Sequence, residues 1–236
     1  MLPLAILVAG EPVAGALAAR GTFPDIIRAT VGDAWPGPWR EIDARGGFPA
    51  PERIAGLIIT GSAANVPDRE PWVLAVERYL ARIVPLGLPV FGICFGHQLL
   101  GQALGGEVQR NPRGREIGTV ELHVFDRDPL FADVPSAFAV NVTHVDSVTR
   151  LPSGARVLAR TELEPHAAVY FGDRAWGVQF HPEMDGEILK QYVVAGQAAL
   201  EREGLDATGV LAAARDTPHS AGLLRRFVAR ELAKTS

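Results

Sequence analysis

Cys94 is the only cysteine among the 236 residues, and its neighbours suggest that its thiol is a nucleophile. An apolar, β-branched run ends at Gly92, the order Gly-x-Cys-x-Gly follows, and a helical pattern begins after Gly96. This order of strand, sharp turn and helix is typical of a nucleophile elbow, with cysteine in place of serine. The N-terminus of the helix would favour the thiolate over the thiol. The alternative is a cysteine that only fills the core.

A second segment, Ala175–Met184, supplies a candidate base. Pro182 cannot continue a central strand, so we expect the strand to end near His181 and to hold the imidazole at its tip. Glu183 follows two residues later and is able to reach the other ring nitrogen. Cys94, His181 and Glu183 would then be a nucleophile, a base and an orienting group. For the His-Pro-Glu string alone, an ordinary strand terminus is the alternative.

Four motifs carry a resemblance to a known family. They are GICFGHQ at Gly92–Gln98, GVQFHPE at Gly177–Glu183, LIITGS at Leu57–Ser62, and THVD at Thr143–Asp146. In this order and spacing, the chain resembles the class I (triad-type) glutamine amidotransferase family, and within it the glutaminase domain of GMP synthetases. The resemblance covers roughly residues 4–200. The first two motifs are highly specific, the third moderately so, and the fourth is weak by itself.

The resemblance implies that the Cys94 thiolate attacks the side-chain amide of L-glutamine and forms a γ-glutamyl thioester. His181 would pass the thiol proton to the departing ammonia, and water would then hydrolyse the thioester. The tetrahedral oxyanion needs preorganised donors. The backbone N–H of Phe95, which follows the nucleophile, is one candidate, and the backbone N–H of Gly61, on a neighbouring strand-end loop, is the other. For Gly61, a simple tight turn is the alternative.

The family analogy also implies the substrate contacts. Gln98, in the first turn of the elbow helix, would lie near the glutamine. His144 and Asp146 would face its α-amino and α-carboxylate groups, although an ordinary surface loop would explain the same two residues. No His, Cys, Asp or Glu cluster has the spacing of metal ligands, and no phosphate-binding or dinucleotide glycine pattern is present. We therefore predict no metal and no cofactor.

Composition is consistent with a compact enzyme of the cytoplasm. Hydrophobic residues make up 47% of the chain, which is enough for a core. The net charge of −4 means that the chain lacks the excess of basic residues that is typical of nucleic-acid binding. A lone cysteine excludes an internal disulfide and fits a reducing compartment. The apolar start Met1–Gly10 lacks a basic residue, so we expect a buried first strand rather than a secretory leader. No apolar run is long enough to span a membrane.

Strand and helix patterns alternate along the first half of the chain. We expect strands at Leu4–Val8, Ala55–Thr60 and Leu88–Ile93, helices at Pro71–Ile83 and Phe95–Leu104, and part of a crossover at Thr22–Val31. After Gly114 the strand-like segments are short and joined by Pro/Gly turns, at Ile117–Phe125, Phe138–Val142, Ala155–Ala159 and Ala167–Phe171. These patterns predict an α/β, three-layer fold. Its central sheet is mostly parallel, with helices on both faces and an antiparallel edge.

We expect one glutaminase domain over residues 1–200 and a helical extension over residues 201–236 that packs on the same domain. Ser220–Ala233 has a helical pattern that would either cap the domain or form an interface.

Three functions are compatible with these expectations. The chain is a glutaminase that supplies ammonia to a separate synthetase, or a stand-alone γ-glutamyl hydrolase or peptidase that accepts a γ-glutamyl amide other than glutamine. Both would use the same Cys-His-Glu set, and they differ in the leaving group. The third is a non-catalytic binding module that has kept the fold.

Overall fold

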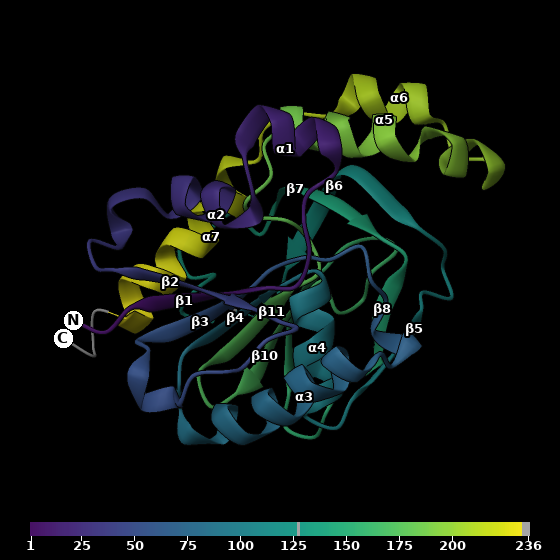
Figure 1. Ribbon diagram of the computed structural model, residues 1–236. Helices are drawn as coiled ribbons and strands as arrows, with labels where there is room; N and C mark the ends of the chain where they lie inside the picture. Colours follow the sequence, from purple (N-terminus) through teal and green to yellow (C-terminus); the bar gives the residue numbers. More distant parts are fainter. Residues whose placement is uncertain (127, 233–236) are drawn as a thin grey trace.

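A large mixed sheet is the centre of the molecule (Figure 1). The computed structural model describes residues 1–126 and 128–232. Within them, one nine-stranded sheet has the order β2 (Trp39–Asp43), β1 (Leu4–Val8), β3 (Gly56–Ile59), β4 (Val90–Ile93), β11 (Ala175–Val178), β10 (Ala168–Gly172), β9 (Arg156–Arg160), β6 (Glu116–Val124) and β7 (Ala137–His144). A separate antiparallel pair joins β5 (Glu107–Arg110) to β8 (Asp146–Arg150).

The sheet changes character at β11. Strands β2, β1, β3, β4 and β11 run parallel to one another, whereas every pairing from β11 to β7 is antiparallel. The four strands β1, β3, β4 and β11 are almost wholly buried, which explains why they are continuous apolar runs. The predicted α/β class, with a parallel centre and an antiparallel part, is confirmed.

Helices cover both faces of this sheet. They are α1 (Ala14–Arg20), α2 (Phe23–Val31), α3 (Pro71–Ile83), α4 (Phe95–Ala103), α5 (Gly186–Arg202), α6 (Ala207–Ala213) and α7 (Pro218–Phe227). Short 3₁₀ turns lie at Gly32–Ala34, Pro51–Arg53, Val66–Asp68 and Val84–Leu86. Figure 1 shows α3 and α4 on one side of the parallel strands and α2 and α7 on the other. In the described residues, no helix combines the length and the apolar character needed to cross a bilayer.

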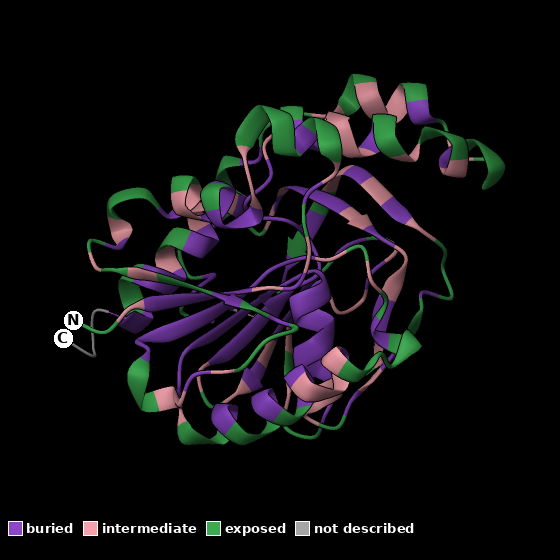
Figure 2. Ribbon diagram, in the orientation of Figure 1, coloured by how far each residue is buried: buried purple, intermediate pink, exposed green. Residues whose placement is uncertain are grey.

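Two hydrophobic cores follow from the alternation of side chains along each strand. Ile6 and Ile58 face the core that includes Phe227 of α7, whereas Leu7 and Ile59 face the core that includes helices α3 and α4. Figure 2 shows that the central strands are buried along their length and that the helices expose only their outer faces. The carboxyl ends of β3, β4 and β11 are thereby held rigidly side by side.

The C-terminal part packs against the same sheet. Helix α7 continues into a π-helical turn, Val228–Leu232, and its apolar side chains are buried beside α2 and β7. The predicted helix Ser220–Ala233 is thus found in two pieces, and Ala233 lies outside the described residues. Helix α5, which has no counterpart among our predictions, contacts α1 and α6.

The two glycines of the elbow are needed for close approach. A Cβ at Gly92 would lie 2.5 Å from the carbonyl oxygen of Gly96, and one at Gly96 would lie 2.6 Å from the carbonyl oxygen of Ile59 in β3. Both contacts are with backbone atoms, so no side chain can move to relieve them. The glycine spacing therefore sets how tightly α4 follows β4 and how closely it packs on β3.

Replacing Gly96 by alanine should lower the free energy of unfolding by about 1–3 kcal/mol, because the added methyl group overpacks the junction of β3 and α4. Urea unfolding of the purified variant measures this loss. Gly47→Ala is the matched control, since its added methyl group meets open space and should leave the stability unchanged. Equal stabilities for the two variants would contradict this account of the elbow.

Candidate active site

Cys94 has the strained backbone that a nucleophile elbow requires. It is the residue before α4, with φ 51° and ψ −101°, a region that residues other than glycine seldom adopt. Its N–H donates to the carbonyl of Val178 at 2.8 Å, which ties the turn to the end of β11. The side chain is 7% exposed and lies at the N-terminus of α4. The positive end of the helix dipole therefore faces the sulfur.

His181 is not held as the sequence suggests. The strand ends at Val178, three residues earlier than expected, and His181 lies in the following loop. Its position is set instead by Asn141 of β7, whose carbonyl accepts the His181 N–H at 2.8 Å and whose side chain donates to the carbonyl of Met184 at 3.0 Å. The backbone of the His181 loop is thus tied to β7, in the antiparallel part of the sheet.

Glu183 orients the imidazole. Its Oε1 lies 2.8 Å from Nδ1 of His181, and both residues are almost completely buried. Nε2 of His181 makes no hydrogen bond of ordinary geometry to any residue that the structure describes. Burial alone would lower the pKa of His181, but the charges of Glu183 and Cys94 and the hydrogen bond to Glu183 outweigh burial and raise the pKa to about 10. The ring therefore favours the imidazolium form.

The structure thus brings Cys94, His181 and Glu183 together, although they come from segments almost ninety residues apart. Another histidine near the elbow, His97, does not take part. It is fully buried against Gly177 and Phe171, at 5.5 Å between ring centroids, and burial lowers its pKa to about 3. A permanently neutral, enclosed imidazole cannot exchange protons with a bound substrate.

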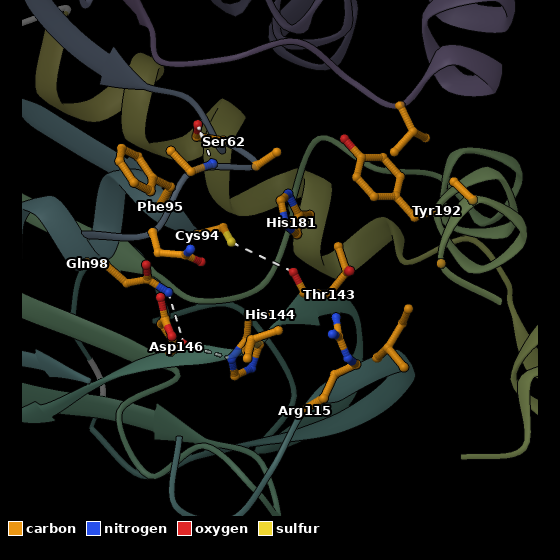
Figure 3. Close-up of a pocket in the computed structure, with 18 of the residues that line it drawn as sticks. Ser62, Cys94, Phe95, Gln98, Arg115, Thr143, His144, Asp146, His181 and Tyr192 are labelled. Atoms are coloured by element: carbon orange, nitrogen blue, oxygen red, sulfur yellow. Dashed lines mark hydrogen bonds between the residues drawn. The ribbon is translucent and has the colours of Figure 1, made fainter. Parts of the chain in front are cut away.

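Two further groups contact the sulfur. The carbonyl oxygen of Thr143 lies 3.9 Å from Cys94 Sγ, as Figure 3 shows, and Nε2 of Gln179 lies 3.5 Å from it. Gln179 belongs to the GVQFHPE motif, which by itself indicates no role for this residue. The signal was available, because Gln179 is a polar residue within a run that otherwise reads as buried. Its side chain is 1% exposed.

The sulfur opens into a cavity of about 310 Å³. Its lining comes from the ends of β3, β4 and β7 and from the α1 and α5 side: Glu11, Val13, Phe23, Ser62, Ala63, Ala64, Asn65, Cys94, Phe95, Gln98, Arg115, Ile117, Thr143, His144, Val145, Asp146, His181, Tyr192, Ala195, Gly196 and Leu200. In Figure 3 the labelled side chains surround this space from both sides of Cys94. A cavity of this size suits a small, amino-acid-like ligand.

The two candidate oxyanion donors, the backbone N–H groups of Phe95 and Gly61, are available to a ligand. Within the described chain, neither the Phe95 N–H nor the Gly61 N–H makes a hydrogen bond. Phe95 lines the cavity, and Gly61 lies just behind it, next to Ser62. A Cβ on Gly61 would approach Cε1 of His181 to 3.2 Å, so the glycine allows the β3 loop to lie close to the imidazole.

Gln98 and His144 are both held firmly by their neighbours. Nε2 of Gln98 donates to the carbonyl of Asp146 at 3.0 Å and to Oε1 of Gln179 at 3.1 Å. Nδ1 of His144 lies 3.1 Å from the same carbonyl, and its Nε2 lies 3.0 Å from Glu116. Both ring nitrogens of His144 are therefore engaged within the protein, although the ring lines the cavity.

Asp146 presents a free carboxylate to the cavity. Its side chain makes no hydrogen bond or ion pair with any residue that the structure describes. Burial and the nearby Asp68 raise its pKa, while Arg110 and His144 act in the opposite direction. An unpaired, half-buried carboxylate of this kind is suited to a cationic ligand group.

Many lining residues were not anticipated from the sequence, and among them Arg115 and Tyr192 carry polar groups into the site. Arg115 immediately precedes β6 and lines the cavity. Its guanidinium group forms two hydrogen bonds with the carboxylate of Glu203, at 2.8 and 3.1 Å. Tyr192 of α5 lies over His181, with ring centroids 6.4 Å apart. Burial and the nearby charges of Glu183 and Cys94 raise the pKa of Tyr192. No motif pointed to Tyr192, because its helix was not predicted.

Several known proteins are similar to this chain in sequence. Residues 39–197 match the family described as glutamine amidotransferase class-I. The chain is 40% identical over 164 residues to "GMP synthase [glutamine-hydrolyzing]" of Aeropyrum pernix, covering 70% of this chain and 28% of that protein. The protein of the same name from Symbiobacterium thermophilum is 41% identical over 149 residues, covering 59% and 28%. The chain therefore spans little more than a quarter of the length of these curated relatives.

Solved structures show the same fold. A glutamine amidotransferase from Thermotoga maritima superposes with a TM-score of 0.78 at 22% identity, covering 98% of this chain and 99% of that one. A glutamine amidotransferase from Methylobacillus flagellatus superposes with a TM-score of 0.71 at 21% identity, covering 99% and 95%.

Proposed function

Because this chain belongs to the class I glutamine amidotransferase family, we propose that it hydrolyses the side-chain amide of L-glutamine to glutamate and ammonia, the ammonia serving a separate synthetase. The observation that carries this proposal is the arrangement of Cys94, His181 and Glu183 at one end of the cavity. The full-length relatives are named as GMP synthases, which is the support for a synthetase partner.

The reaction begins with attack of the Cys94 thiolate on the amide carbon of glutamine. The carbonyl oxygen gains the negative charge and is stabilised by the free N–H groups of Phe95 and Gly61. His181, as imidazolium, donates its Nε2 proton to the amide nitrogen, and ammonia leaves as the C–N bond breaks. The product of this half-reaction is a γ-glutamyl thioester on Cys94 and a neutral imidazole.

Water completes the cycle. The neutral His181 removes a proton from a water molecule, whose oxygen attacks the thioester carbonyl, and the same N–H groups stabilise the second oxyanion. Collapse releases glutamate and restores the thiolate and imidazolium. Glu183 acts throughout on Nδ1, where it fixes the ring and stabilises its charged form.

The two ends of the amino-acid backbone of glutamine have candidate partners. The free Asp146 carboxylate is placed to bind the α-ammonium group, with the unengaged Oε1 of Gln98 beside it. Arg115 is the one lysine or arginine among the described lining residues and is suited to the α-carboxylate. We assign His144 to this substrate site as well, where its two hydrogen bonds hold the Asp146 loop in place.

One observation favours a second candidate function. The cavity lining includes the large side chains of Phe23, Tyr192 and Leu200. Their apolar surface would suit a leaving amine larger than ammonia. A stand-alone γ-glutamyl hydrolase would use that space with the same Cys-His-Glu set.

We further propose that residues 1–200 form the glutaminase domain and residues 201–236 a helical extension of it. The family match ends at residue 197, and α7 packs on α2 and the sheet. A cytoplasmic location is proposed from the single cysteine.

The deciding assay measures ammonia and glutamate release from L-glutamine by the purified chain, with γ-glutamyl dipeptides and glutathione in parallel. Release from glutamine that depends on Cys94 supports the glutaminase. Release of amine from the peptides, with glutamine poorly used, supports the hydrolase. Without turnover of any of these substrates, and without trapping of a glutamine-analogue electrophile on Cys94, both proposals fail.

Glu183→Gln should lower kcat by roughly 100- to 10,000-fold, which is less than loss of the nucleophile. The glutamine amide can still contact the His181 ring, but the negative charge of the carboxylate is gone. The pKa of His181 should fall with that charge, so the alkaline limb of the pH–activity curve should move to lower pH. Steady-state kinetics across pH tests both effects. Glu187→Gln on the exposed start of α5 is the control and should behave as wild type. If Glu183→Gln proved worse than Cys94→Ala, its assignment as an orienting group would be wrong.

A further inference from the structure

Gln179 lies between the substrate loop and the nucleophile. It follows β11 directly, and its N–H donates to the carbonyl of Ala167 at 2.9 Å, which fixes the backbone. The side chain is fully enclosed and contacts two polar partners, Gln98 at one end and Cys94 at the other. An enclosed amide in direct contact with a reacting atom calls for a chemical explanation, because a buried polar group is costly where an apolar one would fit.

The hydrogen-bond network fixes which end of the amide faces the sulfur. Nε2 of Gln98 donates to the Asp146 carbonyl, which can only accept, so this amide cannot be reversed. Its second hydrogen points to Gln179, whose acceptor Oε1 must therefore face Gln98 at 3.1 Å. The N–H₂ group of Gln179 is left facing Cys94 Sγ at 3.5 Å.

We propose that Gln179 is a further catalytic residue, which donates an N–H to Cys94 Sγ and thereby stabilises the thiolate for attack. The inference rests on the proposed role of Cys94 as nucleophile. An N–H donor stabilises an anionic sulfur more than a neutral one, since hydrogen bonds to charged groups are the stronger class. The opposite influence comes from the Thr143 carbonyl, 3.9 Å away, which can accept only from the protonated thiol.

Several charged and titratable groups surround Cys94. On the β11 side these are His181 and Glu183, on α5 Tyr192, and at the junction of β7 and β8 His144 and Asp146. Glu11 and Arg115 complete the set at the rim of the cavity. Replacement of Gln179 by an uncharged side chain leaves all of these in place, so a change in the thiol's titration reports the missing donor.

The test uses the full chain and the rate at which iodoacetamide alkylates Cys94 as a function of pH. Because Cys94 is the only cysteine, every thiol adduct reports this sulfur. Gln179→Met keeps the length of the side chain without a donor, and the midpoint of the alkylation profile should rise by about one pH unit or more. Gln179→Glu keeps an acceptor for Gln98 and places negative charge near the sulfur, so its midpoint should rise further.

Gln191→Met on α5 is the matched control, because Gln191 bonds Glu187 and does not line the cavity. It should keep the wild-type midpoint. A loss of packing alone would lower the melting temperature without moving the alkylation midpoint, so thermal unfolding is measured on each variant. If Gln179→Met destabilises the fold, Gln179→Leu, which also removes the donor without adding a charge, carries the test.

An unchanged midpoint in a folded, uncharged Gln179 variant would overturn the inference, whatever the result for Gln179→Glu, whose own charge raises the midpoint. Its failure is distinct from failure of the proposed function, which is decided by turnover of γ-glutamyl substrates by the wild-type chain and needs no Gln179 variant.

Discussion

Cys94→Ala should abolish hydrolysis of γ-glutamyl substrates, with turnover reduced at least about 10,000-fold and the fold intact. The methyl side chain cannot form a thioester. The oxyanion donors and the substrate contacts remain, but no covalent intermediate forms for them to stabilise. Glutamate release from L-glutamine measures the loss. The side chain is almost enclosed but small, so its truncation leaves little space behind and the melting temperature should stay close to that of the wild type.

Ser220→Ala is the control for removing one buried heteroatom. Ser220 is fully enclosed on α7 and does not line the cavity, so this variant should keep full turnover. A glutamine-analogue electrophile should add one label to the wild type, on Cys94, and none to Cys94→Ala. Retention of most activity by Cys94→Ala, or a label on another residue, would rule out the thioester route.

His181→Asn should be nearly as severe as loss of the cysteine. Asparagine cannot carry the proton from the thiol to the leaving nitrogen, and it removes the cation that stabilises the thiolate. We expect a fall in kcat of at least about 1,000-fold, measured with saturating glutamine. His123→Asn is the control, since His123 is exposed on β6 beside Glu121 and should tolerate the change. Comparable losses in the two histidine variants would show that His181 is not the base.

The same variant should change how stability depends on pH. The pKa of His181 is raised from 6.5 to about 10 in the folded protein. A raised pKa means that the folded state holds the proton more tightly than the unfolded chain does. The stabilisation is therefore complete below about pH 6.5 and is lost as the pH rises toward 10. In His181→Asn this part of the decline in melting temperature should disappear.

The parallel half of the fold was predictable because its signals are local. The strand at Leu4–Val8 and the helix at Pro71–Ile83 have the predicted bounds, since a continuous apolar run and a 3.6-residue period each mark their ends. The Gly-x-Cys-x-Gly order likewise predicts the elbow, because the contacts that exclude a Cβ at Gly92 and Gly96 arise within a few residues and from the neighbouring strand.

The elements that the sequence patterns did not predict depend mainly on contacts with other parts of the chain. β2 exposes most of its residues and pairs only with β1, so its sequence carries no clear period. Helix α5 buries few of its 17 residues and packs against α6, the next helix, and against α1, near the start of the chain. His181 was expected at a strand tip, yet Asn141 holds it through a hydrogen bond that no local pattern reveals. The lining residues Arg115 and Tyr192 depend on the same distant packing.

The change of strand direction at β11 has a consequence for how the chain can be divided. The thiol lies before the exposed turn at Gly114, whereas the imidazole, the orienting carboxylate and Asp146 all lie after it. The two segments meet along the pairing of β4 with β11, residue against residue from Val90 to Ile93. A polypeptide cut at this turn would give two inert fragments, and catalysis would return only on their reassociation. The segments before and after Gly114 therefore act as two complementary halves of one active site, which the intact chain keeps together.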